Sequence, residues 1–322
     1  MIRLKHCSAA LLALLLAQSP VWGKTFPERP VTFLVPFPAG TATDVIARIV
    51  GNKLSEKWGQ SVVVDNRPGA GGNIGSDTAS KAKPDGYTVL WATVANSISM
   101  TLYKNLQYNF KDDFDAVALV TSLPLVLVTN QNRSYETLPE MIEFAKTQKE
   151  ALTFGSGGVG TSNHLAGEML NSLGGIRMVH VPYKGTPNAY SDLIADRISV
   201  MFDNIVPAMA QIRTGNLKPL AVASLERSPQ LPKVPTVSES GYPGFEAVSW
   251  VGMVVPRSTP AQVIEKINQD TVAVLNDPDV REKLTVFGAQ VKPSTPAEFD
   301  AFIDAEIEKW AKVIKQANVT IE

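Results

Sequence analysis

The chain has 322 residues, of which 44% are hydrophobic and 19% are charged, with 30 basic and 31 acidic side chains. These proportions are typical of a soluble globular protein, and the length allows two domains with separate cores. The even charge balance excludes a nucleic-acid partner, so an anionic ligand would have to be held by local dipoles and a few cations.

The first 23 residues have the pattern of a secretory signal peptide. Arg3, Lys5 and His6 precede an apolar run over 9–17, and cleavage is expected just before Lys24. The run is too short to cross a bilayer. The single cysteine, Cys7, lies inside this segment, so the exported chain has no disulfide. Export without disulfides favours the bacterial periplasm. Without Arg3 and Lys5 the chain keeps 28 basic and 31 acidic residues, a net charge of about −3.

From Lys24 onward, predicted strands and helices alternate in the rhythm of parallel sheets covered by helices. Strands are expected at 31–35, 61–64 and 87–92, and long apolar runs follow at 116–128 and 247–255. We interpret these two runs as strands that cross between two lobes, the first made of 24–123 plus 247–322 and the second of 124–246. Helices are expected at 260–276, 279–287 and 296–316, and the Pro-rich stretch 226–244 is typical of a rigid excursion.

One arrangement occurs three times along the chain: an apolar strand, a tight loop of Gly, Pro and Thr or Ser, and then a helix start. Strand 31–35 enters loop 36–44, strand 152–154 enters loop 155–164, and strand 178–183 enters loop 184–188. Each loop places unpaired backbone N–H groups and a positive helix end at one edge of a sheet, where an anion can bind. Several such loops around one crevice would hold a small anion without catalytic machinery, which favours a carrier or receptor over an enzyme.

In the first loop, Thr41 precedes Asp44 by three residues, the spacing of a helix cap with an acidic partner. Capping is therefore the favoured role of Asp44. The backbone N–H groups of 39–43 are expected to contact the ligand, because Gly40 lets the backbone approach closely.

The second loop matches G-x-G-x-x-G over 155–160, the dinucleotide fingerprint. No acidic residue ends the following strand, the loop lies mid-chain, and export removes the chain from a nicotinamide pool, so we favour a carboxylate held by Ser156, Thr161 and the N–H groups between them. His164 and Glu168 have the spacing of half a metal site, but the exported chain offers only one more histidine, His180, and no cysteine. Local hydrogen bonding is the favoured role of His164. The chain has no G-x-S-x-G elbow, so a hydrolase has little support.

In the third loop, Thr186 is expected as the N-cap and Pro187 as the first helical residue. Lys184 either neutralises a ligand carboxylate or is a solvated surface lysine. Asp203, at the end of a later strand, either accepts a hydrogen bond from a ligand hydroxyl or amine or ties down a neighbouring loop. The Gly-rich loop 66–75 lacks the Lys-Ser/Thr ending of a P-loop, so a structural role is expected, with Asn66 and Arg67 holding the turn.

Taken together, these blocks resemble the extracytoplasmic receptors of tripartite tricarboxylate transporters, the Bug family. The resemblance covers nearly the whole chain after the signal and depends on six ordered blocks, at 35–48, 66–72, 84–88, 155–168, 181–185 and 201–204. One departure is Thr41, where the family usually has a second glycine, and the added methyl and hydroxyl could change ligand size or polarity.

The resemblance implies a type II periplasmic-binding-protein fold, α/β, with each lobe a mostly parallel sheet flanked by helices and joined to the other by two crossing strands. It implies a ligand carboxylate held between the lobes and no catalysis, cofactor or metal. The candidate contact residues are Phe37, Pro38, Ala39, Gly40, Thr41, Thr43, Asp44, Thr93, Ser156, Gly157, Gly158, Thr161, His164, Tyr183, Lys184, Gly185, Thr186 and Asp203.

The partners implied are a small carboxylate (a di- or tricarboxylate, an aromatic acid or an amino acid) and membrane permease subunits, with the receptor itself a monomer. Two alternatives stay open from the sequence: a solute sensor that signals to a membrane-bound partner, and an exported α/β enzyme that acts on a carboxylate.

Overall fold

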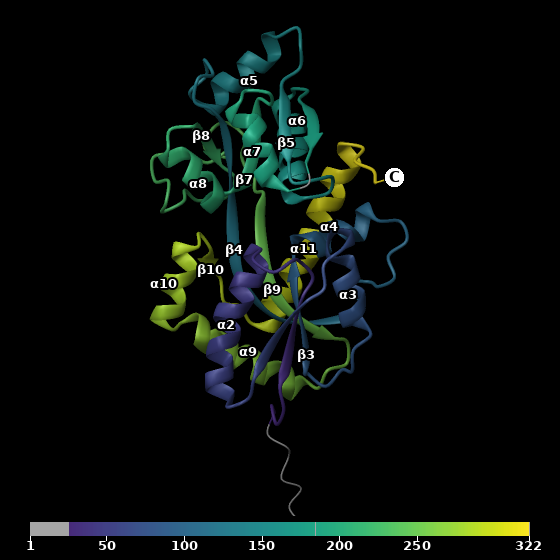
Figure 1. The fold of residues 1–322 in the computed structure, drawn as a ribbon. Coiled ribbons are helices and arrows are strands. Elements are labelled where there is room, and N and C mark those ends of the chain that lie inside the picture. Colours follow the sequence, from purple (N-terminus) through teal and green to yellow (C-terminus); the bar gives the residue numbers. More distant parts are fainter. Residues whose placement is uncertain (1–25, 184, 322) are drawn as a thin grey trace, which may run out of the picture.

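The computed structural model describes residues 26–183 and 185–321, and shows two lobes stacked along one axis (Figure 1). The predicted signal peptide and Lys184 lie outside the described residues. The strands β4 (Phe114–Asn130) and β9 (Val248–Pro256) run from one lobe towards the other, and the long helix α11 (Pro296–Gln316) lies beside them. The chain therefore has the two-lobed α/β arrangement that the sequence predicts.

The first lobe contains the N-terminal elements and most of the C-terminal ones. They are β1 (Val31–Val35), α2 (Ala42–Trp58), β2 (Val62–Asn66), the short 3-10 turn η1 (Ala70–Gly72), α3 (Asn73–Ser80), β3 (Thr88–Thr93), α4 (Val94–Leu102), α9 (Ala261–Leu275), α10 (Pro278–Val286) and β10 (Gln290–Val291). The second lobe contains α5 (Leu138–Thr147), β5 (Thr153–Ser156), α6 (Ser162–Gly174), β6 (Val179–Pro182), α7 (Thr186–Ile194), β7 (Val200–Asn204), α8 (Ile205–Arg213) and β8 (Leu217–Val222).

The strands form one path in the order β2-β1-β3-β9-β4-β7-β5-β6, with β8 and β10 also paired to β4. Within each lobe the βαβ strands are parallel: β1 lies between β2 and β3, and β5 lies between β6 and β7. Parallel strands end at the same edge, so the loops that follow β1, β5 and β7 all open toward the space between the lobes.

The strand β4 is shared by the two halves of this path. Its first part pairs with β9 from Phe114 to Pro124, and its second part pairs with β7 and β8 from Leu125 to Asn130. Just before β9, the Ala247 N–H donates to the carbonyl of Ala223, the residue after β8, at 2.9 Å. The lobe boundaries at 123/124 and 246/247 stay a prediction of the sequence.

Helix α11 is fastened to β9 by a buried carboxylate. The indole N–H groups of Trp250 and Trp310 each donate to Glu306 Oε2, at 2.9 Å. Glu306 is 3% exposed and pairs with Lys309, so its charge is compensated. The helix bounds match the predicted 296–316, because Thr295 and Glu298 form a capping box at its start.

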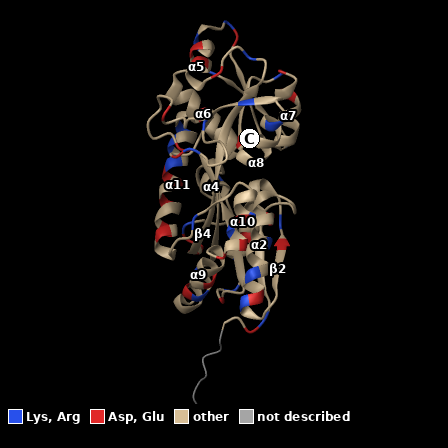
Figure 2. Ribbon diagram, turned by 90° about the vertical axis from the view of Figure 1, so that its left-hand side faces the viewer, with Lys and Arg blue, Asp and Glu red and all other residues tan. Residues whose placement is uncertain are grey.

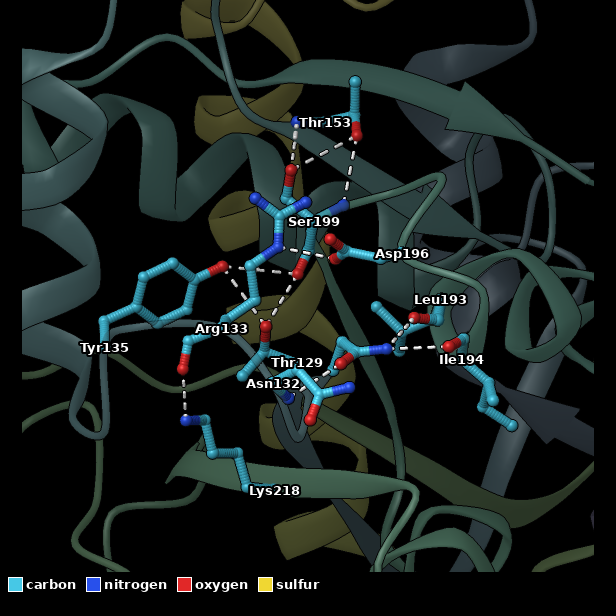
Figure 3. A network of polar contacts seen from close by, with 11 residues as sticks. Thr129, Asn132, Arg133, Tyr135, Thr153, Leu193, Ile194, Asp196, Ser199 and Lys218 are labelled. Carbon is cyan, nitrogen blue, oxygen red and sulfur yellow. Dashed lines mark hydrogen bonds and ion pairs between the residues drawn. The ribbon is translucent and has the colours of Figure 1, made fainter.

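The far end of the second lobe is held by a polar network (Figure 3). Thr129 Oγ1 donates to the Ser199 carbonyl at 2.8 Å, and the Thr153 and Ser199 side chains exchange hydrogen bonds with each other's backbone N–H groups. Arg133 pairs with Asp196 and its carbonyl accepts from Lys218. This network ties β4, β5 and β7 together at the end away from the first lobe.

Two predicted helix starts need correction. The predicted N-cap of α7, Thr186, is its first helical residue: Gly185, with a φ of +94°, stands at the N-cap, and Pro187 follows inside the first turn. Thr41 is the N-cap of α2, but its side chain makes no capping bond, because Thr41 Oγ1 instead donates to the Pro38 carbonyl at 2.8 Å.

Candidate ligand-binding site

The loop after β1 is held from below by Asp44. Asp44 Oδ2 accepts from the Gly40 N–H at 2.9 Å, and its two oxygens also accept from Arg48 and from Asn66 Nδ2. The carboxyl is 2% exposed. Burial alone would raise its pKa, but the hydrogen bonds from Arg48, Gly40 and Asn66 outweigh burial and lower the pKa. Asp44 therefore fixes the loop, in agreement with its expected structural role.

Asn66 reaches across to the same loop. Its amide donates to the Phe37 carbonyl as well as to Asp44, each at 3.0 Å, whereas the exposed Arg67 pairs with the half-buried Asp65. The expected structural role of Asn66 is confirmed, but Asn66 stabilises the loop after β1 rather than its own turn. The candidate residues Pro38, Ala39 and Gly40 are exposed at the tip of that loop.

The loop after β5 is also closed by internal hydrogen bonds. Ser156 Oγ donates to the Gly158 carbonyl at 3.0 Å and accepts from the Gly158 N–H at 3.1 Å. Thr161 Oγ1 donates to the same carbonyl and accepts from the His164 N–H, as an N-cap does. The two predicted carboxylate-binding hydroxyls are thus engaged within the loop, where they set the directions of the remaining N–H groups. Their contact with a ligand stays a prediction.

Two stacked histidines support this loop. His164 Nδ1 accepts from the Gly160 N–H at 3.1 Å, so the local hydrogen bonding expected of His164 is confirmed. Its ring stacks on that of His180, with centroids 3.7 Å apart, and His180 Nε2 lies 2.6 Å from Ser156 Oγ. Burial, followed by the neighbouring His164, lowers the pKa of His180 to about 4, so this ring is neutral near pH 7.

The loop before α7 lies against the loop after β5. The Gly185 N–H donates to the Gly157 carbonyl at 3.2 Å, and the Tyr183 N–H donates to the Ser156 carbonyl at 3.1 Å. The Tyr183 hydroxyl points elsewhere and donates to Asp192 at 2.7 Å; burial and this bond raise the pKa of Tyr183 to about 12. The fold thus brings two of the three predicted loops, those at 155–164 and 184–188, together within the second lobe.

A cavity of about 270 Å³ lies between the lobes. Ala42, at the start of α2, contributes from the first lobe, together with Phe287 and Gly288 after α10. The second lobe contributes Thr186, at the start of α7, and the segment 203–207, which enters α8. Three helix starts from both lobes therefore meet at one cavity, and their first-turn N–H groups have no acceptor within their own helices.

Asp203 lines this cavity and is 1% exposed. Its Oδ1 accepts from Asn163 Nδ2 at 3.1 Å, whereas Oδ2 is buried without a well-directed hydrogen bond among the described residues. Burial raises the pKa of Asp203 to about 6, although Tyr190, the Asn204 N–H, Thr186 and Asn163 are near enough to lower it in part. Asp203 therefore ties α6 to β7, the second of its two expected roles; a contact with the ligand stays a prediction.

The other candidates lie in several places. Thr93 caps α4, where it accepts from the Ala95 N–H, and Thr43 lies in the first turn of α2, next to Ala42. Ala42 belongs to the segment 39–43 that the sequence predicts near the ligand, but sequence reasoning missed the rest of the apolar wall, made by Leu123, Ile205, Val206, Pro207 and Phe287. No motif marks these five residues, because they come from three separate segments and share only their apolar character.

The comparisons with known proteins agree with this geometry. A sequence model described as the tripartite tricarboxylate transporter family receptor matches residues 46–319. A UPF0065 protein encoded between tcbD and tcbE in Pseudomonas sp. strain P51 is 40% identical over 90% of this chain and 86% of its own length. Protein BugT of Bordetella pertussis strain Tohama I is 34% identical over 94% of both chains.

Among solved structures, periplasmic binding protein BugD is 35% identical, with a TM-score of 0.79 over 92% of this chain and all of its own. The R. palustris protein Rpa4515 with adipate is 32% identical, with a TM-score of 0.82 over 92% of this chain and 99% of its own. MatC from Rhodopseudomonas palustris with bound malate is 32% identical, with a TM-score of 0.77 over 90% of this chain and all of its own. The chain belongs to the Bug family, the solute-binding receptors of tripartite tricarboxylate transporters.

Proposed function

We propose that this protein is a periplasmic receptor that captures a small carboxylate between its lobes and delivers it to a tripartite tricarboxylate-type membrane transporter. The observation that carries the proposal is the meeting of three helix starts, from α2, α7 and α8, at one interlobe cavity. Such ends favour an anion through their N–H groups and dipoles. Adipate and malate in the two related structures are both carboxylates.

The predicted contact residues take two roles in this proposal. Ala39, Thr43, Gly157 and Thr186 offer backbone N–H groups or side chains next to the crevice. Asp44, Ser156, Thr161 and His164 hold the loops in shape. Lobe closure then desolvates the bound acid, as in the hinge motions that periplasmic binding proteins undergo.

The surface charge supports a receptor that does not attract its ligand by a global field. Figure 2 shows the positions of acidic and basic residues interspersed along the ribbons of α11, α2 and α9. Local dipoles must then provide the affinity. No helix in the described part of the chain is both long and apolar enough to cross a bilayer. Location in the periplasm is part of the proposal, supported by the predicted signal and by relatives of that compartment.

One contact could favour the alternative that the protein is an enzyme: Ser156 Oγ lies 2.6 Å from His180 Nε2, as a nucleophile lies next to its base. A nucleophile must reach its substrate, yet Ser156 is fully buried and its hydroxyl donates to Gly158. A histidine with a pKa of about 4 is also a weak base near pH 7. We therefore assign the pair to loop support.

The test is thermal unfolding of residues 24–322 against a panel of small carboxylates. A ligand at a hundred times its Kd adds about 2.7 kcal/mol to the free energy of unfolding, enough to raise Tm by several degrees. A shift with one chemical class supports the receptor. No shift with any acid, after refolding to strip copurified ligand, contradicts the proposed function. Neighbouring genes for a large and a small membrane subunit would favour transport over sensing.

A further inference from the structure

The wall of the interlobe cavity is mainly apolar. Ala42, Leu123, Ile205, Val206, Pro207 and Phe287 supply it. Leu123 and Ile205 are 4% and 2% exposed and belong to the apolar cores of the first and the second lobe, so this part of the wall is fixed by packing. A fixed apolar wall favours a ligand whose body is apolar.

The described residues that line the cavity carry negative charge only. Among the described lining residues there is no lysine or arginine, and the single ionisable side chain is the acidic Asp203. Asp203 has an oxygen without a well-directed hydrogen bond, so a second negative charge next to it would be repelled rather than compensated. The helix starts can hold one carboxylate, but nothing among these residues neutralises another.

The size of the cavity fits one ring. Its volume is about 270 Å³, whereas an apolar cavity of roughly 150 Å³ already takes up benzene. A one-ring acid therefore fits, with room for its carboxylate at the helix starts.

We propose that the receptor selects a monocarboxylate with an apolar body of about one ring, in preference to a dicarboxylate of the same length. This inference rests on the proposed function, because it assigns the substrate class of the same cavity. The carboxylate lies at the starts of α2, α7 and α8, and the body lies against Leu123, Ile205 and Phe287. The adipate-bound relative differs in this respect, since adipate carries a charge at each end.

Calorimetric titration of residues 24–322 with four probes tests the selection: benzoate, cyclohexanecarboxylate, adipate and benzyl alcohol. We expect both ring acids to bind at least tenfold more tightly than adipate, and benzyl alcohol, which lacks the carboxylate, to bind more weakly than either. Adipate binding as tightly as benzoate overturns the inference but leaves the carboxylate receptor intact. Binding of benzyl alcohol as tight as benzoate contradicts the carboxylate itself, and with it the proposed function.

A matched pair of variants locates the site. Phe287→Ala removes part of the wall and should weaken benzoate roughly tenfold. Val286→Ala, on the same helix end but 76% exposed, should leave the Kd unchanged within twofold. Circular dichroism and Tm establish that both variants are folded. Equal Kd values for the two variants would place the ring elsewhere and overturn the inference.

Discussion

Gly288 offers a direct test of lobe closure. It follows α10 in the first lobe with a φ of +82°, and a Cβ built there would lie 2.2 Å from Val206 Cγ2 of the second lobe. Val206 is β-branched and cannot turn aside easily. Gly288→Ala should therefore oppose the approach of the two lobes on this side of the cavity.

The expected magnitude has two parts. A left-handed conformation costs alanine about 1 kcal/mol, wherever it occurs. The collision with Val206 adds about 1–3 kcal/mol to any arrangement in which the two lobes are as close here as they are in this structure, the usual cost of overpacking. If binding requires closure, the apparent affinity falls by roughly 5- to 150-fold.

Gly244→Ala is the matched control. Gly244 has a φ of +78° and open space where a Cβ would stand, so this variant carries the strain without the collision. The assay is titration with the acid that most raises Tm, together with the radius of gyration from solution scattering. Gly288→Ala should stay expanded on addition of that acid, and the double variant with Val206→Ala should regain compaction. A Gly288→Ala Kd within twofold of the control would refute the reasoning.

Three further predictions concern the groups that hold the loops. Asp44→Ala leaves the donors of Gly40, Arg48 and Asn66 without their acceptor, and should cost about 2–4 kcal/mol in urea unfolding at pH 7; an unchanged midpoint would contradict the role of Asp44. Burial raises the pKa of Asp203 from 3.8 to about 6, so the folded state holds the proton longer and stability falls as pH rises through this window. As the pH rises from 4 to 7, the free energy of unfolding of Asp203→Asn should therefore rise by about 2–3 kcal/mol relative to that of the native chain. The lowered pKa of His180, about 4 against 6.5, has the opposite sign, because the unfolded chain takes up the proton first and stability falls as pH drops through this window. As the pH falls from 7 to 4.5, the free energy of unfolding of His180→Gln should therefore rise by about 2 kcal/mol relative to that of the native chain. If the difference between the two free energies does not vary with pH, burial does not lower the pKa of His180.

Most of the fold follows from local patterns in the sequence. The sequence predicts the strand at 31–35 and the helix at 296–316 with their observed bounds, because an apolar run and a proline at a helix start are local signals. The start of α7 was predicted one residue late. Thr and Pro are both common at helix starts, and only the backbone shows that Gly185, with its positive φ, takes the N-cap.

Only part of the candidate site could be predicted from the sequence. The loops at 36–44 and 155–164 could be found because Gly, Pro and Thr stand next to strands. The wall could not, because Leu123 and Phe287 belong to no motif and meet only because β10, which follows α10, pairs with β4 next to Leu123. Apolar residues that line a cavity look the same in a sequence as those that fill a core.

The internal hydrogen bonds of the loops support the proposal that the wall decides specificity. Gly40, Gly158 and Gly160 each donate their N–H to a side chain of their own segment, namely Asp44, Ser156 and His164. A loop held in this way presents its remaining N–H groups in fixed directions, so it can hold a carboxylate but adapts little to the rest of a ligand. Discrimination between acids must then come from what surrounds their bodies, which in this chain is an apolar wall and one buried carboxyl group.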